Sequence, residues 1–127
     1  MEQYEAALND FNRAIELNPN LAWALAERGE TYRLMQQYEA ALNDFNRAIE
    51  LDPKDSWTLA SRGQTYRLMK QYEAALNDFN RAIELDPKYT WAFNQRNLTY
   101  LQMMRFVPAV IGYIKLILIG LSKNKNS

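Results

Sequence analysis

The segment QYEAALNDFNRAIEL occupies residues 3–17, and the same letters return unchanged at 37–51 and 71–85. The three copies therefore begin 34 residues apart, at positions 3, 37 and 71. The sequence between the copies is also conserved between the first two units, because blocks 3–36 and 37–70 differ only at positions 18, 20, 21, 22, 24, 27, 30 and 36. A fixed period of this length predicts a stacked repeat array, in which each unit packs mainly against its neighbours.

The repeated segment has the pattern of an amphipathic helix. In the second copy its apolar residues recur at spacings of three and four, which places them on one stripe of a helix. Pro53 follows the segment and disfavours helical geometry at Asp52, so the helix is predicted to end there. Asn20 and Asp55 are predicted to cap the helices that come next. The apolar stripe consists of Tyr38, Ala41, Leu42, Phe45, Ala48 and Ile49.

A second helix is predicted between the copies, over the segment AWALAERGETYRLM at 22–35. Gly29 stands in its middle, where glycine costs about 1 kcal/mol relative to alanine, and Gly63 recurs at the same place. We expect the missing side chain to allow a close approach of the partner helix. Each unit is then a pair of antiparallel helices, and the stacking of neighbouring pairs builds one continuous core.

The period and the pattern resemble the tetratricopeptide repeat over nearly the whole chain. Leu25 occupies the tryptophan site of that signature and Arg28 its leucine site, which is similar to an arginine–glycine, bacterial-type subclass. The resemblance implies an all-α fold, a right-handed α–α superhelix in which antiparallel helices stack into a solenoid. The residues that match the signature are Gly29, Tyr32, Ala41, Phe45, Ala48 and Pro53 in one unit, and Gly63, Tyr66, Ala75, Phe79, Ala82 and Pro87 in the next.

We denote the first helix of a unit A and the second helix B. The predicted layout is B-AB-AB-AB, seven helices in a single solenoid over residues 1–121. In the last unit Ala109 and Tyr113 take the alanine and phenylalanine sites of the B helix, while Phe106 and Lys115 take the tyrosine and arginine sites. The parts of the chain are a lone B helix at 3–17, repeats at 21–51, 55–85 and 89–121, the last with a degenerate apolar B helix, and a disordered tail at 122–127.

This last B helix is apolar on its outer side as well. The apolar residues there are spaced by four, three and four, which is the seam of a helix–helix contact, so we expect a contact with a second chain or a further repeat. Two alternatives stay open: an interfacial membrane segment flanked by Arg105, Lys123 and Lys125, and a tail with no selected role. The residues predicted for self-association are Val107, Ile111, Ile114 and Leu118.

The lone B helix at the other end has a matching open side. Its residues Tyr4, Ala7, Phe11 and Ala14 correspond to those that face an A helix in the other copies. Contact between the two unlike ends would be heterologous. We therefore predict a homo-oligomer, either a dimer or a swapped assembly.

In the resembled family the A helices line a concave groove that binds peptides, and in this chain most differences between units lie in the A helices. The resemblance therefore implies a non-catalytic protein–protein interaction scaffold that binds a peptide or a helix in its groove. The alternative function is a self-assembling structural fragment, domain-swapped or head-to-tail, driven by the apolar C-terminal helix. Carried over by position, the peptide-binding groove comprises Trp23, Glu27, Glu30, Arg33, Trp57, Ser61, Gln64, Arg67, Trp91, Asn94, Gln95 and Leu98.

Two sets of residues in this groove have a structural alternative. The three tryptophans, at equivalent sites, are either anchors for a peptide or large residues that pack between repeats. Arg33 and Arg67 either hold a carboxylate in a fork or pair with a neighbouring acid such as Glu30.

A further arginine recurs beside the glycine of each unit, at Arg28, Arg62 and Arg96. We expect a structural role there, with the stem buried and the guanidinium bonded to an acid on a B helix. The candidate acids are Asp10, Asp44 and Asp78.

One subtype of the family holds the C-terminal carboxylate of chaperones with lysine and asparagine at set positions of the groove. The resemblance does not extend to that clamp, because those positions here hold Ala26, Glu30, Ser61, Trp91 and Gln95.

The composition argues against several other classes of function. Lys plus Arg and Asp plus Glu both number 15, so the formal net charge is zero and no basic patch for nucleic acid is expected. There is no His and no Cys, so the commonest general base and metal ligands are missing. We predict no catalytic activity, no metal site and no cofactor. The N-terminus has no basic segment leading into an apolar one, so no secretory signal is visible and we predict a cytoplasmic protein. The apolar run near the C-terminus falls short of the roughly 20 residues that span a bilayer, so a membrane partner is not the interpretation we favour.

Overall fold

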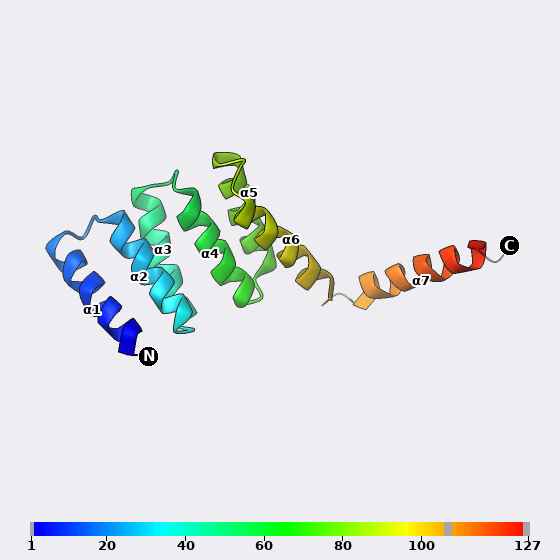
Figure 1. Ribbon diagram of the computed structural model, residues 1–127, viewed down its shortest axis with the longest axis horizontal. Helices are drawn as coiled ribbons and strands as arrows, with labels where there is room; N and C mark the ends of the chain where they lie inside the picture. The colour runs from blue at the N-terminus through cyan, green and yellow to red at the C-terminus, as the bar shows by residue number, and fades with distance from the viewer. Residues whose placement is uncertain (1, 106–107, 126–127) are drawn as a thin grey trace.

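The computed structural model describes residues 2–105 and 108–125, and the side chains of residues 2–105 and 112–123. Within these residues the chain forms seven α-helices and no strand, as predicted. Figure 1 shows α1 to α6 stacked side by side in chain order, with α7 projecting from the far end. The helices are α1 (Glu2–Leu17), α2 (Ala22–Leu34), α3 (Tyr38–Leu51), α4 (Ser56–Leu68), α5 (Tyr72–Leu85), α6 (Thr90–Arg105) and α7 (Pro108–Lys125).

The start of α4 follows from the side chain of Asp55. Its Oδ1 accepts hydrogen bonds from the backbone N–H groups of Trp57 at 3.0 Å and Thr58 at 3.4 Å, as expected of an N-cap. The same prediction for Asn20 is wrong, because the residue at the N-cap of α2 is Leu21, which makes no side-chain cap bond. Asn20 instead lies in the preceding turn, where its backbone N–H donates to Oδ1 of Asn18 at 3.1 Å.

The ends of α2 and α4 place a non-glycine residue in the left-handed region. Gln36 has φ 62° and Lys70 has φ 63°. After α2, the N–H of Gln37 donates to the carbonyl of Tyr32 at 2.8 Å, and the N–H of Gln36 donates to that of Arg33 at 2.9 Å. This pair of bonds is a Schellman motif, which satisfies the last carbonyls of the helix and ordinarily has glycine at the left-handed position.

We predict that Gln36→Gly stabilises the chain. A side chain in the left-handed region costs about 1–2 kcal/mol, and glycine removes that cost but adds entropy to the unfolded chain. The net gain expected in the free energy of unfolding is about 0.5–1 kcal/mol, measurable by urea denaturation followed by circular dichroism. Gln37→Gly is the matched control, since the φ of Gln37 is −95°. An equal gain in both variants would contradict this account.

The A and B helices of a unit meet at the recurring glycine. A Cβ atom added to Gly29 would lie 2.9 Å from Cε1 of Phe45, and one added to Gly63 would lie equally close to Phe79. Both phenylalanine rings are fully buried. The close approach predicted at these glycines is thus confirmed, and it accounts for glycine in the middle of a helix.

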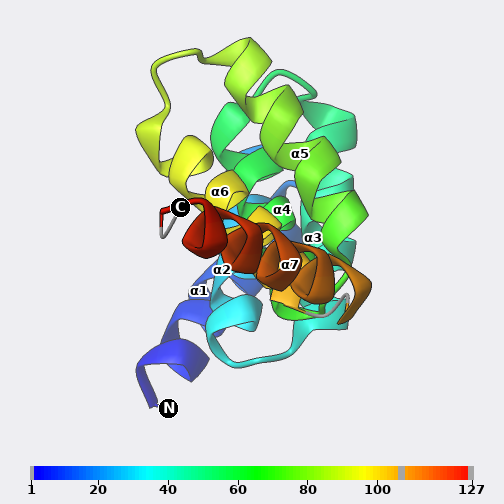
Figure 2. The same ribbon diagram turned by 90° about the vertical axis from the view of Figure 1, so that its right-hand side faces the viewer.

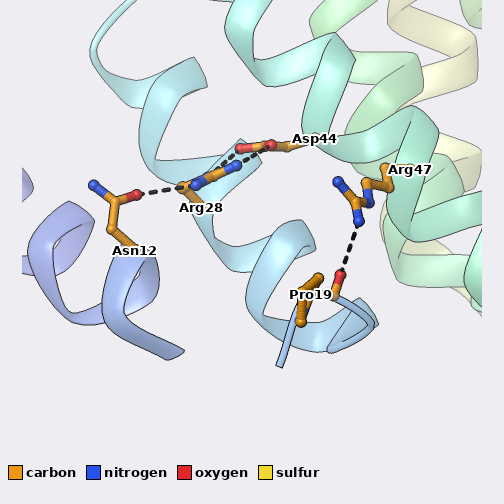
Figure 3. Close-up of polar contacts among 5 residues, drawn as sticks. All are labelled: Asn12, Pro19, Arg28, Asp44 and Arg47. Atoms are coloured by element: carbon orange, nitrogen blue, oxygen red, sulfur yellow. Dashed lines mark hydrogen bonds and ion pairs between the residues drawn. The ribbon is translucent and has the colours of Figure 1, made fainter. Parts of the chain in front are cut away.

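The A helices α2 and α4 are each also joined to two B helices through the recurring arginine, as Figure 3 shows for Arg28. Arg28 donates from Nε and Nη2 to the two carboxylate oxygens of Asp44, both at 2.7 Å, and from Nη1 to Oδ1 of Asn12 at 3.0 Å. The hydrogen bonds to Asp44 raise the pKa of Arg28 above its ordinary value. The structural role expected for this arginine is confirmed, and it ties α2 to both α1 and α3.

Arg62 repeats the arrangement one unit later. Its Nε and Nη2 donate to Asp78 at 2.8 Å and 2.7 Å, and its Nη1 donates to Asn46 at 2.9 Å. The guanidinium lies over the ring of Tyr66, 5.8 Å from its centroid. The polar bonds between helices thus recur with the same period as the sequence.

The last unit departs from the expected fourth B helix. α7 does not fold back along α6 but projects away from the array (Figure 1), and from the end of the molecule it is seen in front of the other helices (Figure 2). The interactions that hold the earlier pairs together are missing here, because Asn97 stands at the glycine site and Gly112 at the aspartate site. The helix continues through residues 122–125, which were expected in a disordered tail.

α7 exposes apolar side chains on several sides: Tyr113, Leu116, Ile117, Leu118, Ile119 and Leu121 are each between 47% and 69% exposed. Within residues 2–105 and 108–125, no helix combines the length and apolarity needed to cross a bilayer.

Candidate functional site

The residues predicted for the groove all lie on the three A helices. These are Trp23, Glu27, Glu30 and Arg33 on α2, Trp57, Ser61, Gln64 and Arg67 on α4, and Trp91, Asn94, Gln95 and Leu98 on α6. These A helices contact one another directly, α2 with α4 and α4 with α6. We call their exposed side the A-helix face. Its chemistry changes along the array, since Leu98 and Leu101 stand where the earlier units have polar or charged residues. Leu101 is 60% exposed.

The three tryptophans differ in exposure although their sites are equivalent. Trp57 packs against the core cluster of Leu25, Ala26 and Ala48, so it joins one unit to the next. Trp91 packs in the same way on the following cluster, and its ring centroid lies 5.9 Å from that of Tyr89. Trp23, by contrast, is 58% exposed. Two of the three therefore take part in packing between repeats, and Trp23 is the most exposed of the three.

Other predicted site residues divide between surface and core. Glu27, Asn94 and Leu98 are exposed. Gln64 and Gln95 are partly buried, and Oε1 of Gln95 is buried without a donor in the described part of the chain. Ser61 is only 2% exposed, and its carbonyl accepts from Oγ1 of Thr65 at 2.9 Å. Ala26 is buried to the same degree. Neither Ser61 nor Ala26 has surface to offer a partner, which removes two positions of the chaperone-tail clamp.

Arg33 and Arg67 occupy equivalent sites in different electrostatic surroundings. Arg33 is bound by Glu30 on its own helix, with Nε donating to Oε2 at 3.1 Å and Nη2 to Oε1. In the next unit the residue at the site of Glu30 is Gln64, so Arg67 has no such acid. The structural alternative considered for these arginines thus describes Arg33, while Arg67 has a different environment.

Arg67 has donor capacity left over. Its Nη1 donates to Oε1 of Gln102 at a long 3.3 Å, and its Nε is buried without an acceptor in the described part of the chain. Burial lowers the pKa of Arg67 below its ordinary value, with Tyr72 opposing and Arg33 adding to the effect. A guanidinium placed in this way is stabilised by any carboxylate or other anion that approaches it.

A cavity of about 260 Å³ opens beside Arg67. It lies where the end of α4, the start of α5 and the end of α6 meet. Three of its six lining residues carry positive charge and none carries negative charge, so its chemistry favours an anionic group. The lining residues are Arg67, Leu68, Lys70, Tyr72, Gln102 and Arg105.

Sequence reasoning singled out Arg67 for this region but missed Lys70, Gln102 and Arg105. Lys70 lies in the turn after α4 while Gln102 and Arg105 lie on α6, and the contact between α4 and α6 is what brings them together. One signal was available in the sequence: the change from Glu30 to Gln64 between units removes the acid that neutralises the groove arginine.

The predicted self-association residues are only partly within the described side chains. Val107 lies outside the described residues, and the side chain of Ile111 lies outside the described side chains. Ile114 is 37% exposed and Leu118 is 60% exposed. Ile114 lines a small apolar hollow with Leu101 and Met104 of α6, so α7 touches the C-terminal part of α6.

No group of His, Cys, Asp or Glu residues in the described ranges has the arrangement of a metal site.

Solved structures similar to this chain include the first TPR domain of Spaghetti (RPAP3), bound to the HSP90 peptide SRMEEVD. It has a TM-score of 0.77 and 20% identity, over 80% of this chain and 81% of that one. The Arabidopsis OM64 TPR domain has a TM-score of 0.76 and 24% identity, over 80% and 84% of the two chains.

A third similar structure is YrrB, a TPR protein with an unusual peptide-binding site. It has a TM-score of 0.71 and 29% identity, over 76% of this chain and 50% of that one. A search of the curated proteins gives no significant match. The family model described as Tetratricopeptide repeat matches residues 22–55 and 56–89, and one described as TPR repeat matches residues 1–36. Because these matches cover more than half of the sequence and the solved structures share its fold, the chain belongs to the tetratricopeptide repeat family.

Proposed function

We propose that this chain is a non-catalytic protein-interaction module whose A-helix face binds a segment of a partner protein, with an acidic group of that segment held at Arg67. The observation that carries the proposal is the buried Nε of Arg67, which has no acceptor and lies beside a cavity whose charged residues are all cationic. Similar structures support the general class, since one is bound to a peptide and another has a peptide-binding site. The cytoplasmic location stays a prediction from the sequence.

The exposed residues of the A-helix face suggest how such a segment would lie. Trp23 at one end and Leu98 and Leu101 at the other offer apolar surface. Arg67 stands between them in the order of the units. Apolar contacts would supply most of the binding free energy, while the charged hydrogen bond would set the register of the peptide.

We predict that peptides selected on the intact chain from a random display library carry an acidic residue, and that Arg67→Gln weakens their binding roughly tenfold or more. A hydrogen bond to a charged group contributes about 1.5–3 kcal/mol, and 1.4 kcal/mol is a factor of ten in affinity. Fluorescence anisotropy with the strongest synthetic peptide measures the change. The affinity should also fall as salt is added.

Arg33→Gln is the matched control for that experiment. It removes an equivalent arginine that Glu30 already neutralises, so it should change the affinity by less than about threefold. Replacement of the acidic residues of the peptide by their amides should match the effect of Arg67→Gln. The proposal fails if no peptide is selected, or if Arg67→Gln binds the selected peptides as tightly as the unmodified chain does.

A second candidate function is self-association, which the exposed apolar side chains of α7 favour. A helix that is apolar on most of its circumference is typically buried against another surface. If α7 drives assembly, Ile114→Lys together with Leu118→Lys should reduce the assembled mass to that of the monomer, as measured by sedimentation velocity.

A further inference from the structure

The structure contains one B-helix sequence in two different surroundings. α3 packs between α2 and α4, and α5 packs between α4 and α6, whereas α1 contacts only α2 among the described residues. α3 and α5 each bury an alanine, an aspartate and a phenylalanine of the shared sequence, but α1 has no buried residue. The side of α1 that corresponds to the A-facing side of α3 is therefore not covered by any described helix of this chain.

α6 offers the complementary surface. Like Arg62, Arg96 donates from Nη1 to an asparagine of the preceding B helix, here Asn80 at 2.9 Å. Its Nε, however, is buried and has no acceptor within the described residues. Its guanidinium lies over the ring of Phe93, 5.1 Å from the centroid, and the outer residues Asn97 and Tyr100 are exposed. α6 thus has the polar half of a contact whose other half is missing.

The chain's own next helix does not supply that half. Residues 108–125 contain no Asp or Glu, and Gly112 stands where Asp44 and Asp78 stand in the earlier units. The hollow between the two helices involves Leu101, Met104 and Arg105, toward the C-terminal end of α6. The surface around Arg96 and Asn97 is left for another B helix.

We infer that α1 of a second copy of this chain docks on the outer side of α6, as α5 docks on α4 within one chain. Asp10 of the second copy would then accept the hydrogen bonds of Arg96, with the pairing of Arg62 and Asp78 as its template. Asp10 is exposed and makes no hydrogen bond or ion pair within the described residues, so it is available. This inference goes beyond the second candidate function, because it places the contact between copies at α1 and α6 rather than at α7.

The repeat period explains why such a junction would fit. From α1 to α6 the helices follow the order B-AB-AB-A, so the two outermost helices of this stack are a B helix, α1, and an A helix, α6. Docking of unlike ends continues the same stacking from one copy to the next. The contact is heterologous, and it produces an open head-to-tail assembly whose mean mass rises with concentration.

Asn97 should weaken this junction relative to the pairs within the chain. At the equivalent Gly63, a Cβ atom would lie 2.9 Å from the ring of Phe79. Phe11 of the second copy would meet the side chain of Asn97 in the same place and would have to shift. Asn97→Gly is therefore expected to tighten the association severalfold, even though glycine is a poorer helix former than asparagine.

The test uses the full chain and two variants that each block one end. Asp10→Arg blocks α1 and leaves α6 open, while Arg96→Gln blocks α6 and leaves α1 open. We expect the unmodified chain to show a mass above the monomer by sedimentation velocity at tens of micromolar. Each variant alone should associate at least tenfold more weakly, and an equimolar mixture of the two should stop at the mass of a dimer. Circular dichroism verifies that each variant is folded.

Each other outcome overturns the inference. A monomer at all concentrations, for the unmodified chain and for Asn97→Gly, excludes the junction. If Asp10→Arg leaves the mass unchanged while the lysine substitutions at Ile114 and Leu118 abolish assembly, α7 drives association and the contact between α1 and α6 is wrong. Peptide binding by the A-helix face is measured separately with Arg67→Gln, so the failure of one proposal is distinguishable from the failure of the other.

Discussion

Asp44→Ala should lower the free energy of unfolding by about 3 kcal/mol. The Asp44 side chain is 8% exposed, and its two oxygens accept the bonds of Arg28 at 2.7 Å. Without it, Nε and Nη2 of a partly buried guanidinium lose their acceptors, and the cost of burying that charge is no longer offset. Urea denaturation followed by circular dichroism measures the loss.

The repeat supplies a matched control with the same local sequence. Asp10→Ala removes the equivalent aspartate from the identical sequence in α1, where Asp10 is exposed and makes no hydrogen bond within the described residues. Its cost should be within about 0.5 kcal/mol at concentrations where the chain is a monomer. The double variant Arg28→Met with Asp44→Leu should recover much of the loss, because it replaces the ion pair by apolar side chains. Equal effects at Asp44 and Asp10 would contradict the structural role of the pair.

The sequence allowed the hairpins to be predicted because their determinants are local and repeated. Gly29 and Phe45 recur at one spacing in each unit, and the structure places them in contact. The partners of Arg28 and Arg62 were also within the range of candidates, since an aspartate stands at a constant position on each B helix. Where the same residues recur in register, their contacts recur as well.

The placement of α7 could not be derived from its apolar pattern. Tyr113 and Lys115 matched the sites of a B helix, and such a pattern predicts a helix that is buried against something. The pattern does not identify the surface against which the helix is buried. The decisive differences are single residues, Asn97 on α6 and Gly112 on α7, which remove the close approach and the ion pair that hold the earlier units together.

The candidate site was predictable only in part for a related reason. The register of the repeat located Arg67 and the three tryptophans, but exposure depends on the neighbouring unit. Trp57 is covered by the unit before it, whereas Trp23 is 58% exposed. The cavity beside Arg67 depends on where α4, α5 and α6 end relative to one another, which no single helix pattern specifies.

Phe45→Ala is expected to have the largest effect of any single substitution considered for this chain, about 3–5 kcal/mol in the free energy of unfolding. The ring is fully buried and fills the space above Gly29. Its loss leaves a cavity between α2 and α3 that the backbone can close only in part. Thermal and urea unfolding, followed by circular dichroism, measure this loss.

The same substitution at Phe11 separates packing from local propensity. Phe11 has the same neighbours in sequence as Phe45 but is only partly buried, on a helix without a fully buried residue. Helix propensity changes equally at both sites, so the difference between the two variants reports the contact with the A helix alone. We expect Phe11→Ala to cost about 1 kcal/mol in the monomer. Adding Gly29→Ala to Phe45→Ala should then regain less than about 1 kcal/mol through helix propensity, because the new Cβ atom would still lie 3.2 Å from the carbonyl oxygen of Ala41. Gly29→Ala by itself should destabilise the chain, because the ring of Phe45 still occupies the space that the new Cβ atom requires.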